Sequence, residues 1–369
     1  MKLRLALVAL TFLQPAPRLQ AYGPIGHEII GAIADERLSG TPAGKKVSQL
    51  LDGMTLEKAA VIPDEIRGWD KNGPDAPGIF HYTSRPRLDA ALTEFWKANP
   101  PTHDEDSPVP SHHWFHYTDV PIVPAQRYGD GTIGRSKWDI VHAMRYCIAV
   151  LRGEEPEDNP RKITKPIAII LLAHYVGDIH QPLHVGAEYF DEQGQPADPT
   201  KTKALADDGG NSIKLEHGPA AVEKIHHRES GLHGFWDNQA VTLNLPDLTA
   251  EMPKDERHQR SEEAMSSLAH QFATEEPKNW RLPNDLPLSA YPEAWANEIL
   301  PIAREANERL AFRDVHPQQL EGHMASVGFA EGKVSADGKS YEDWASGVVR
   351  EELHRAGWRL ADLLEKALR

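Results

Sequence analysis

Histidine and aspartate side chains recur at helical spacing near the middle of the 369-residue chain. His174 and Asp178 are four residues apart and directly follow an apolar run over residues 167–173, which predicts a buried helix. Residues four apart lie on one helix face, about 5–6 Å apart at Cβ, so the two side chains can hold one ion. Pro182 stops the helix, and His184 follows on the next turn. The pattern predicts a buried helix that ends in a metal site.

Further metal-ligand residues occur elsewhere in the chain. His233 and Asp237 repeat the spacing of four residues. His27 stands at the front of a predicted helix, Asp64 lies in another, and His116 offers one more imidazole. Imidazole and carboxylate ligands without a thiolate suit Zn²⁺ in a metal-assisted hydrolase. The clustering of these pairs favours a catalytic metal centre over isolated capping or surface residues.

Other histidines fit no such spacing. His180 is two residues from Asp178 and therefore points away from the ligand face, so we expect it behind the ligands or at the surface. Four more are interpreted as solvated polar residues: His112, His113, His226 and His227.

The N-terminus has the pattern of a secretory signal peptide. Lys2 and Arg4 precede an apolar stretch over residues 5–13, and a polar segment ends at Ala21, where we expect cleavage. A membrane anchor is the alternative, but the stretch is too short to span a bilayer. The sequence therefore predicts residues 1–21 as a signal peptide and residues 22–369 as an exported protein, periplasmic or secreted, without stable membrane association.

Charge and cysteine content narrow the functional classes. The formal net charge is −15, and removal of residues 1–21 would make it more negative because that segment holds only basic charges. Such a charge disfavours a polyanionic substrate unless bound divalent cations reverse the local field. The single Cys147 excludes an intramolecular disulfide, which is compatible with export into a bacterial periplasm or medium.

Helical periodicity dominates the chain and predicts one mainly α-helical domain over residues 22–369. Thr41 and Pro42 have the N-cap and first-position pattern of a helix start. A strand is predicted only at residues 212–216, and residues 313–340, which carry several Gly and His residues, are predicted to be a loop insertion. The predicted helices are His27–Leu38, Pro42–Leu51, Leu56–Trp69, Leu88–Lys97, Ser136–Arg152, Lys165–Ile179, Phe235–Leu243, Asp255–Thr274, Pro292–Phe312 and Tyr341–Leu368.

Five motifs in order resemble the zinc-dependent single-strand nucleases, the S-one/P-one nuclease family, which is related to bacterial phospholipase C. The core motif is His-x-x-x-Asp-x-x-Gln-Pro-Leu-His, at residues 174–184. The other four are a Trp-Gly-x-x-Gly-His-like start at residues 22–27, an Ala-Asp-x-x-Arg-like element at 64–67, a His-Phe/Tyr-x-Asp element at 116–119, and Leu-His-x-x-Trp-Asp at 232–237. Residues 209–211 and 356–361 also resemble family elements.

The resemblance implies an all-α, single-domain helical bundle of the phospholipase C/nuclease type, with a trinuclear zinc cleft. It assigns a first Zn²⁺ to Asp64, His116, His174 and Asp178, and a second to His184, His233 and Asp237. A third would be held by the α-amino and carbonyl groups of Tyr22 with His27 and Asp178, so that Asp178 bridges two ions.

The implied activity is hydrolysis of single-stranded DNA and RNA to 5′-phosphorylated products, with 3′-nucleotidase activity as an extension. Asp64, Asp178 and Asn238 are the catalytic residues that the resemblance implies, with Asp64 orienting the attacking water. Tyr117 would stack a base, Asp119 would accept a hydrogen bond from a base edge, and Asn238 would contact the substrate near the cleaved phosphate. We expect a monomer that acts on single-stranded nucleic acid and short oligonucleotides.

The sequence departs from the family pattern in three places. Tyr22 replaces the first Trp, and because its ligand atoms are main-chain, only cleavage after Ala21 frees the amine for metal binding. His81 is an alternative to His116 as a metal ligand, because it is nearer to Asp64 in the sequence. Ile299 stands where the family commonly has Ser.

Two other functional classes stay open. A phospholipase C acting on phosphatidylcholine-type lipids shares the fold and metals, but Asp237 is the shorter acid of the nuclease branch. A non-catalytic zinc-binding protein would need fewer ligands than this chain offers.

Overall fold

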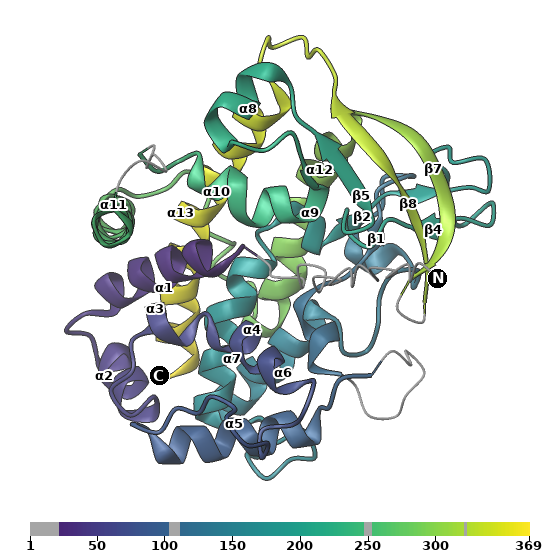
Figure 1. The fold of residues 1–369 in the computed structure, drawn as a ribbon. Helices are drawn as coiled ribbons and strands as arrows, with labels where there is room; N and C mark the ends of the chain where they lie inside the picture. Colours follow the sequence, from purple (N-terminus) through teal and green to yellow (C-terminus); the bar gives the residue numbers. More distant parts are fainter. Residues whose placement is uncertain (1–21, 103–110, 247–252, 321–322) are drawn as a thin grey trace, which may run out of the picture.

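The apolar run ahead of His174 forms the buried centre of the fold. In the computed structural model, which describes residues 22–102, 111–246, 253–320 and 323–369, this run lies in helix α7 (Lys165–Asp178). Nearly every residue of α7 is buried, as expected for a helix that is apolar on all sides. Helices α6 (Ile140–Arg152), α13 (Tyr341–Ala367) and α1 (Pro24–Leu38) pack against it (Figure 1). The expectation of a mainly α-helical fold is confirmed; the predicted signal peptide lies outside the described residues.

The remaining helices surround this centre. The longer ones are α2 (Pro42–Leu50), α5 (Pro86–Ala98), α11 (Lys254–Thr274) and α12 (Tyr291–Glu308). The short ones are α3 (Leu56–Ala59), α4 (Ile62–Glu65), α8 (Pro219–Ile225), α9 (Leu232–Gly234) and α10 (Ala240–Thr242). Single turns of other helix types are η1 (Ile66–Trp69), η2 (His112–His116), η3 (Tyr128–Asp130), η4 (Pro182–His184), the π-helical η5 (Phe235–Gln239) and η6 (Leu288–Ala290).

The predicted start of α2 is confirmed. The Thr41 hydroxyl accepts a hydrogen bond of 3.0 Å from the Gly44 backbone N–H, and Pro42 occupies the first turn. Both features satisfy or remove N–H groups that have no partner within a helix. Most other predicted helices exist with ends that differ by a few residues.

The single helix predicted over Leu56–Trp69 is wrong, because the chain forms α3, α4 and η1 instead. Pro63 lacks the N–H that a continuous helix would direct at the Ala59 carbonyl, and a proline disfavours the α conformation of the residue before it. The chain therefore restarts at Ile62, with Pro63 in the first turn of α4. This restart places Asp64 in a turn of its own, directly ahead of η1.

The strands form small sheets at one end of the molecule (Figure 1). A four-stranded sheet has the order β6 (Glu229–Gly231), β5 (Ile213–Glu216), β8 (His323–Gly332), β7 (Leu310–Leu320), with β5 and β8 parallel and the other pairs antiparallel. Two-stranded pairs are β1 (Val120–Pro121) with β2 (Gly186–Ala187), and β3 (Tyr189–Phe190) with β4 (Leu205–Ala206). The predicted strand at residues 212–216 is confirmed as β5.

The loop predicted at residues 313–340 is wrong for most of its length, because β7 and β8 form a long antiparallel hairpin there. Strand β7 also begins at Leu310, inside the helix predicted to reach Phe312. Pro317 lies within β7, which is an edge strand of the sheet, where a missing N–H is tolerated. A shift of register between Arg313 and His316 also interrupts the alternation of apolar and polar residues by which a strand is recognised in a sequence.

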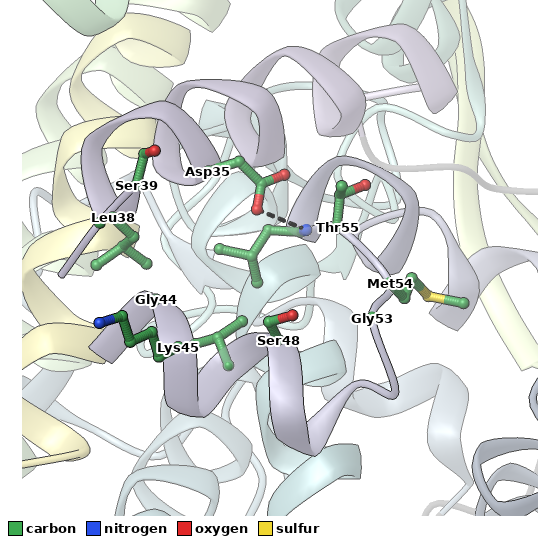
Figure 2. A pocket seen from close by; sticks show the side chains of 12 residues that line it. Asp35, Leu38, Ser39, Gly44, Lys45, Ser48, Gly53, Met54 and Thr55 are labelled. Atoms are coloured by element: carbon green, nitrogen blue, oxygen red, sulfur yellow. Dashed lines mark hydrogen bonds between the residues drawn. The ribbon is translucent and has the colours of Figure 1, made fainter. Parts of the chain in front are cut away.

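A hollow of about 290 Å³ lies between α1, α2 and the start of α3 (Figure 2). Asp35 on its wall accepts hydrogen bonds of 2.9 and 3.0 Å from the backbone N–H groups of Leu56 and Glu57, which caps α3. None of the residues that line this hollow is a predicted metal ligand. Among the described helices, none combines the length and apolar character that a membrane span requires.

Candidate metal centre

Three buried groups of histidine and aspartate side chains come together from distant parts of the sequence. They are His116, His174 and Asp178; His184, His233 and Asp237; and His27, Asp64 and His174. Within each group the potential ligand atoms lie within 4.8 Å of one another. The sequence predicted all of these side chains as ligands. The first two groups have predicted pairings, but the grouping of His27 with Asp64 and His174 was not predicted.

Helix α7 supplies the core of the first group. The His174 Nε2 and Asp178 Oδ2 atoms lie 3.3 Å apart, as their spacing of four residues predicts. His116, at the end of η2, places its Nδ1 atom 3.0 Å from each of these two side chains. A tetrahedral ion with bonds of 2.0–2.1 Å separates its ligand atoms by about 3.3 Å. The three side chains therefore fit a small divalent cation.

The orientation of His174 depends on the break between α3 and α4. Its Nδ1 atom donates a hydrogen bond of 2.6 Å to the carbonyl oxygen of Ala60. In a continuous helix the Asp64 N–H would bond to that carbonyl, so the restart at Pro63 makes the acceptor available. A donor bond at Nδ1 fixes the tautomer in which Nε2 is free to bind a metal.

His27 lies on the opposite side of Asp178 from His116. Its Nε2 atom is 3.2 Å from Asp178 Oδ1, while Asp178 Oδ2 faces the first group. The His27 and His174 rings stack with centroids 3.8 Å apart. A Cβ atom at Gly177 would lie 2.8 Å from the His27 ring, so only glycine leaves room for it there. Asp178 thus directs one carboxylate oxygen to each of two ligand groups.

Asp64 approaches the first group from α4. Its Oδ1 atom is 3.9 Å from His174 Nε2 and 3.6 Å from the guanidinium of Arg67, three residues later. Arg67 is almost fully buried and holds the carboxylate in place by charge. Asp64 therefore stands slightly apart from the other ligands, at a distance that a small side-chain movement closes.

The second group shows the clearest mark of a metal site. His184 and His233 each direct Nδ1 at a backbone carbonyl, 2.8 Å from His116 O and 2.8 Å from Gly209 O. Both Nδ1 atoms must therefore carry the proton, which leaves both Nε2 atoms as lone pairs when the rings are neutral. These Nε2 atoms face each other 3.0 Å apart. A cation between them converts a repulsive contact into two bonds.

Asp237 completes the second group from the π-helical turn η5, a helix type that is frequent at functional sites. Its Oδ2 atom lies 3.3 Å from His233 Nε2. Gln181 donates a hydrogen bond of 2.9 Å to the other oxygen, Oδ1, and accepts one from the Leu183 backbone N–H. Gly209, whose positive φ of 58° suits glycine, presents the carbonyl that orients His233. Each ligand is thus oriented by a neighbour.

Replacement of Gln181 by Met keeps the side-chain volume but removes the hydrogen bond to Asp237. We expect zinc affinity at the second group to fall about 10- to 100-fold, since loss of a ligand-orienting partner has effects of that size. Zinc titration of the chelator-stripped protein measures this affinity. Gln193→Met, on the exposed loop after β3, is the control and should bind zinc like the unchanged protein. Equal affinities for Q181M and wild type would contradict this role.

Several ligand atoms are buried without a hydrogen-bond partner among the described residues. They are Nε2 of His27, Asp64 Oδ1 and Asp178 Oδ1. A buried polar atom without a partner costs about 1–3 kcal/mol. Such atoms in one place are explained when bound cations are their partners.

Burial sets the protonation of the centre. It lowers the pKa of His27, His116 and His184 and that of His233 to about 3, so these imidazoles are neutral, as metal ligands must be. Burial alone raises the pKa of Asp178, but the neighbouring His174 and hydrogen bonds from the imidazoles lower it well below its usual range; the carboxylates of Asp178 and Asp64 in turn raise the pKa of His174.

The predicted substrate residues are more exposed than the ligands next to them in the sequence. Asn238 is exposed and directly follows Asp237, while Tyr117 and Asp119 are partly exposed beside the buried His116. Tyr22 is fully buried, and its backbone N–H bonds to Asp237 rather than to a residue of the third predicted site. The structure thus places the Tyr22 main chain beside the second group.

His180 is fully buried, so the alternative of a surface position is wrong. Arg359 of α13 donates a hydrogen bond of 2.9 Å to its Nε2 atom, and Nδ1 donates to Val176 O. Arg359 also pairs with Glu298 of α12. Arg359, within the family-like element at residues 356–361, therefore connects helix α12 to the turn that joins Asp178 to His184.

His81 and His116 were the two alternative ligands, and the structure gives them different partners. Both ring nitrogens of His81 are engaged, with Asp89 and with the carbonyl of Pro74. His116, in contrast, faces Asp178 and His174 directly. The geometry therefore favours His116.

The interpretation of His112 and His113 as solvated residues is wrong. His112 is buried and His113 is partly buried, and both pair with Asp70. Asp70 is too distant in sequence for spacing to reveal this contact. His226 and His227 are exposed, as predicted.

Comparison with known proteins gives a consistent result. The family model described as S1/P1 nuclease matches residues 22–369. Endonuclease 2 of Arabidopsis thaliana is 23% identical over 251 residues, which cover 66% of this chain and 63% of that protein. Endonuclease 1 of the same plant is 25% identical over 229 residues, 62% of this chain and 56% of that protein. Endonuclease 4 is 29% identical over 102 residues, 28% of this chain and 26% of that protein. The chain thus spans less than two thirds of the length of each of these relatives.

Proposed function

The chain belongs to the S1/P1 nuclease family, and from this premise we propose that it is a zinc-dependent phosphodiesterase that cleaves single-stranded DNA and RNA to 5′-phosphorylated products. The observation that carries the proposal is the pair of His184 and His233 Nε2 atoms, 3.0 Å apart with both Nδ1 atoms committed to carbonyls. Such a pair needs a cation between its members.

The residues present fit three zinc ions. His116, His174, Asp178 and Asp64 would hold the first, and His184, His233 and Asp237 the second. His27 and Asp178 would hold the third, and the nitrogen of Tyr22, which bonds to Asp237 in the uncleaved chain, would join them as a free amine after cleavage at Ala21. Bound zinc supplies a water that is acidic enough to attack at neutral pH, and positive charge for the phosphate and leaving oxygens.

The protein side chains have separate tasks in this reaction. Asp64 stands slightly away from the other ligands, 3.9 Å from His174, where it can orient the attacking water and accept its proton. Asp178 spans two ligand groups and fixes their separation. Asn238, exposed beside Asp237, would donate a hydrogen bond to the scissile phosphate with the amide N–H that Gly234 O does not accept. Removal of a 3′-phosphate from a nucleotide would use the same groups.

The preference for single strands would come from Tyr117. Its ring is partly exposed next to His116, and a base stacks on such a ring only when it is unpaired. Every base has an aromatic face, so stacking also explains a lack of sequence preference. Asp119, whose backbone N–H is anchored on Gly134 O, would accept a hydrogen bond from a base edge. The acidic net charge of −15 favours short oligonucleotides over long polyanions.

Replacement of Tyr117 by Ala should raise KM for a single-stranded oligonucleotide about 5- to 150-fold, the equivalent of 1–3 kcal/mol of base stacking, and change kcat little. Steady-state kinetics on a fluorescent oligonucleotide measures both constants. Tyr117→Phe keeps the ring and should retain the original KM. An unchanged KM for Y117A would remove Tyr117 from the substrate site.

The experiment that tests the proposed function compares substrates. Zinc-loaded protein that begins at Tyr22 is incubated with single-stranded DNA, the matched duplex, RNA and phosphatidylcholine vesicles. We expect cleavage of both single strands to products with 5′-phosphates, and slower cleavage of the duplex. Lipid turnover without nucleic-acid cleavage would identify a phospholipase C, and tight zinc binding without any turnover a non-catalytic binding protein; either result contradicts the proposal.

A further inference from the structure

A second cluster of metal-ligand residues lies outside the predicted centre. Asp70, at the end of η1, receives His112 Nε2 on its Oδ1 atom at 3.2 Å and His113 Nε2 on its Oδ2 atom at 2.7 Å. All three potential ligand atoms lie within 4.8 Å of one another. The two imidazole rings are consecutive in sequence, yet both direct Nε2 at the same carboxylate, with planes 89° apart. The rings thus approach one point from two directions.

The surroundings of this cluster are those of a preformed site. The His112 side chain is 2% exposed and that of Asp70 14%, so neither moves freely. Trp96 of α5 donates a further hydrogen bond of 2.9 Å to Asp70 Oδ1 and fixes the carboxylate. His113 is 30% exposed, which leaves a route for an ion and a position for a water ligand.

The protonation of the cluster suits a cation. Burial lowers the pKa of His112, and it lowers that of His113 to about 4, so both rings are neutral near pH 7. Burial raises the pKa of Asp70, but hydrogen bonds from the two imidazoles outweigh it and hold the carboxyl ionised. Two neutral imidazoles and one carboxylate are a common protein ligand set for zinc.

We propose that Asp70, His112 and His113 form an additional divalent-cation site, suited to Zn²⁺, with three protein ligands and an open fourth position. The contacts of 3.2 and 2.7 Å to the two carboxylate oxygens would lengthen by about 0.1 and 0.6 Å to reach the ligand separation of about 3.3 Å in a tetrahedral zinc site, and the ligand atoms already lie within 4.8 Å of one another. With the ring protons on Nδ1, a zinc ion bound to both Nε2 atoms would join the same side chains.

The site joins the two segments that present ligands to the main centre. Asp70 follows η1, which continues directly from Asp64 in α4, and His112 and His113 begin the turn η2, which ends at His116. A cation held here would therefore fix the spacing between Asp64 and His116 from outside the centre. This role is structural and does not depend on the proposed activity.

Zinc counting tests the site. Protein stripped with a chelator, reloaded with excess zinc and desalted is analysed by native mass spectrometry. We expect His113→Ala and Asp70→Asn each to hold one zinc ion per chain fewer than the unchanged protein. The matched control is His81→Ala, because His81 is also 30% exposed and pairs with an aspartate, but belongs to no three-ligand group among the described residues. Equal zinc counts in H113A and wild type would overturn the proposal.

A measurement on the unchanged protein guards against variants that fold poorly. Diethyl pyrocarbonate modifies accessible imidazoles, and mass spectrometry locates the modified residue. Zinc at this site should slow modification of His113 relative to the metal-free protein, and leave His81 unaffected. Equal modification of His113 with and without zinc would reduce the cluster to a hydrogen-bonded contact and overturn the proposal.

Discussion

Replacement of Asp178 by Asn should abolish phosphodiester cleavage and lower the zinc content by more than one ion per chain. One carboxylate oxygen faces His116 and His174, and the other faces His27, so a single substitution weakens two ligand groups. Asn has nearly the same shape but no charge. Because partners that merely orient ligands contribute about 10- to 100-fold, loss of a ligand shared by two groups should reduce kcat/KM by more than 100-fold.

Metal analysis and kinetics on the same preparation measure this effect. Asp75→Asn is the control, since Asp75 is 76% exposed and pairs with Lys97 at the surface; its zinc content and kcat/KM should equal those of the wild type. A D178N protein that keeps its full zinc content would show that Asp178 does not bridge two sites.

Removal of the metals by a chelator should lower the melting temperature by roughly 10 °C and abolish activity. A ligand at 1,000 times its dissociation constant stabilises the folded state by about 4 kcal/mol, and 1 kcal/mol changes the melting temperature of a large domain by about 2–4 °C. The buried, unpartnered atoms of His27, Asp64 and Asp178 explain why the metal-free fold is weakened.

Differential scanning calorimetry of loaded and stripped protein measures the shift. Added zinc should restore both the melting temperature and the activity, whereas Mg²⁺ should restore neither, because it prefers oxygen ligands over imidazole. An unchanged melting temperature, with metal loss verified by elemental analysis, would contradict a structural role for these ions.

Two pairs of potential ligands were predictable because residues four apart share one face of a helix. His174 with Asp178 and His233 with Asp237 are four residues apart, and each pair does share a face in the structure, with contacts of 3.3 Å. The apolar run before His174 likewise predicted the buried helix α7. Spacing within one element is a local property, so a single sequence reveals it.

Contacts between distant elements were not predictable in the same way. The pairing of Asp70 with His112 and His113 joins segments some forty residues apart. The hairpin β7–β8 depends on the parallel pairing of β8 with β5, about a hundred residues earlier. Its other strand, β7, is at the edge of the sheet, where a proline such as Pro317 is tolerated although proline is rare in strands. The break at Pro63 was not predicted, and neither was its consequence, an Ala60 carbonyl that accepts a hydrogen bond from His174.

Anomalous X-ray diffraction at the zinc absorption edge tests most directly whether metal ions bind at the three buried ligand groups. Crystals of zinc-loaded protein beginning at Tyr22 should show one peak among His116, His174 and Asp178, one among His184, His233 and Asp237, and one between His27 and Asp178. The His184 and His233 Nε2 atoms lie 3.0 Å apart, and crystals that show no peak between them would contradict the proposed metal centre.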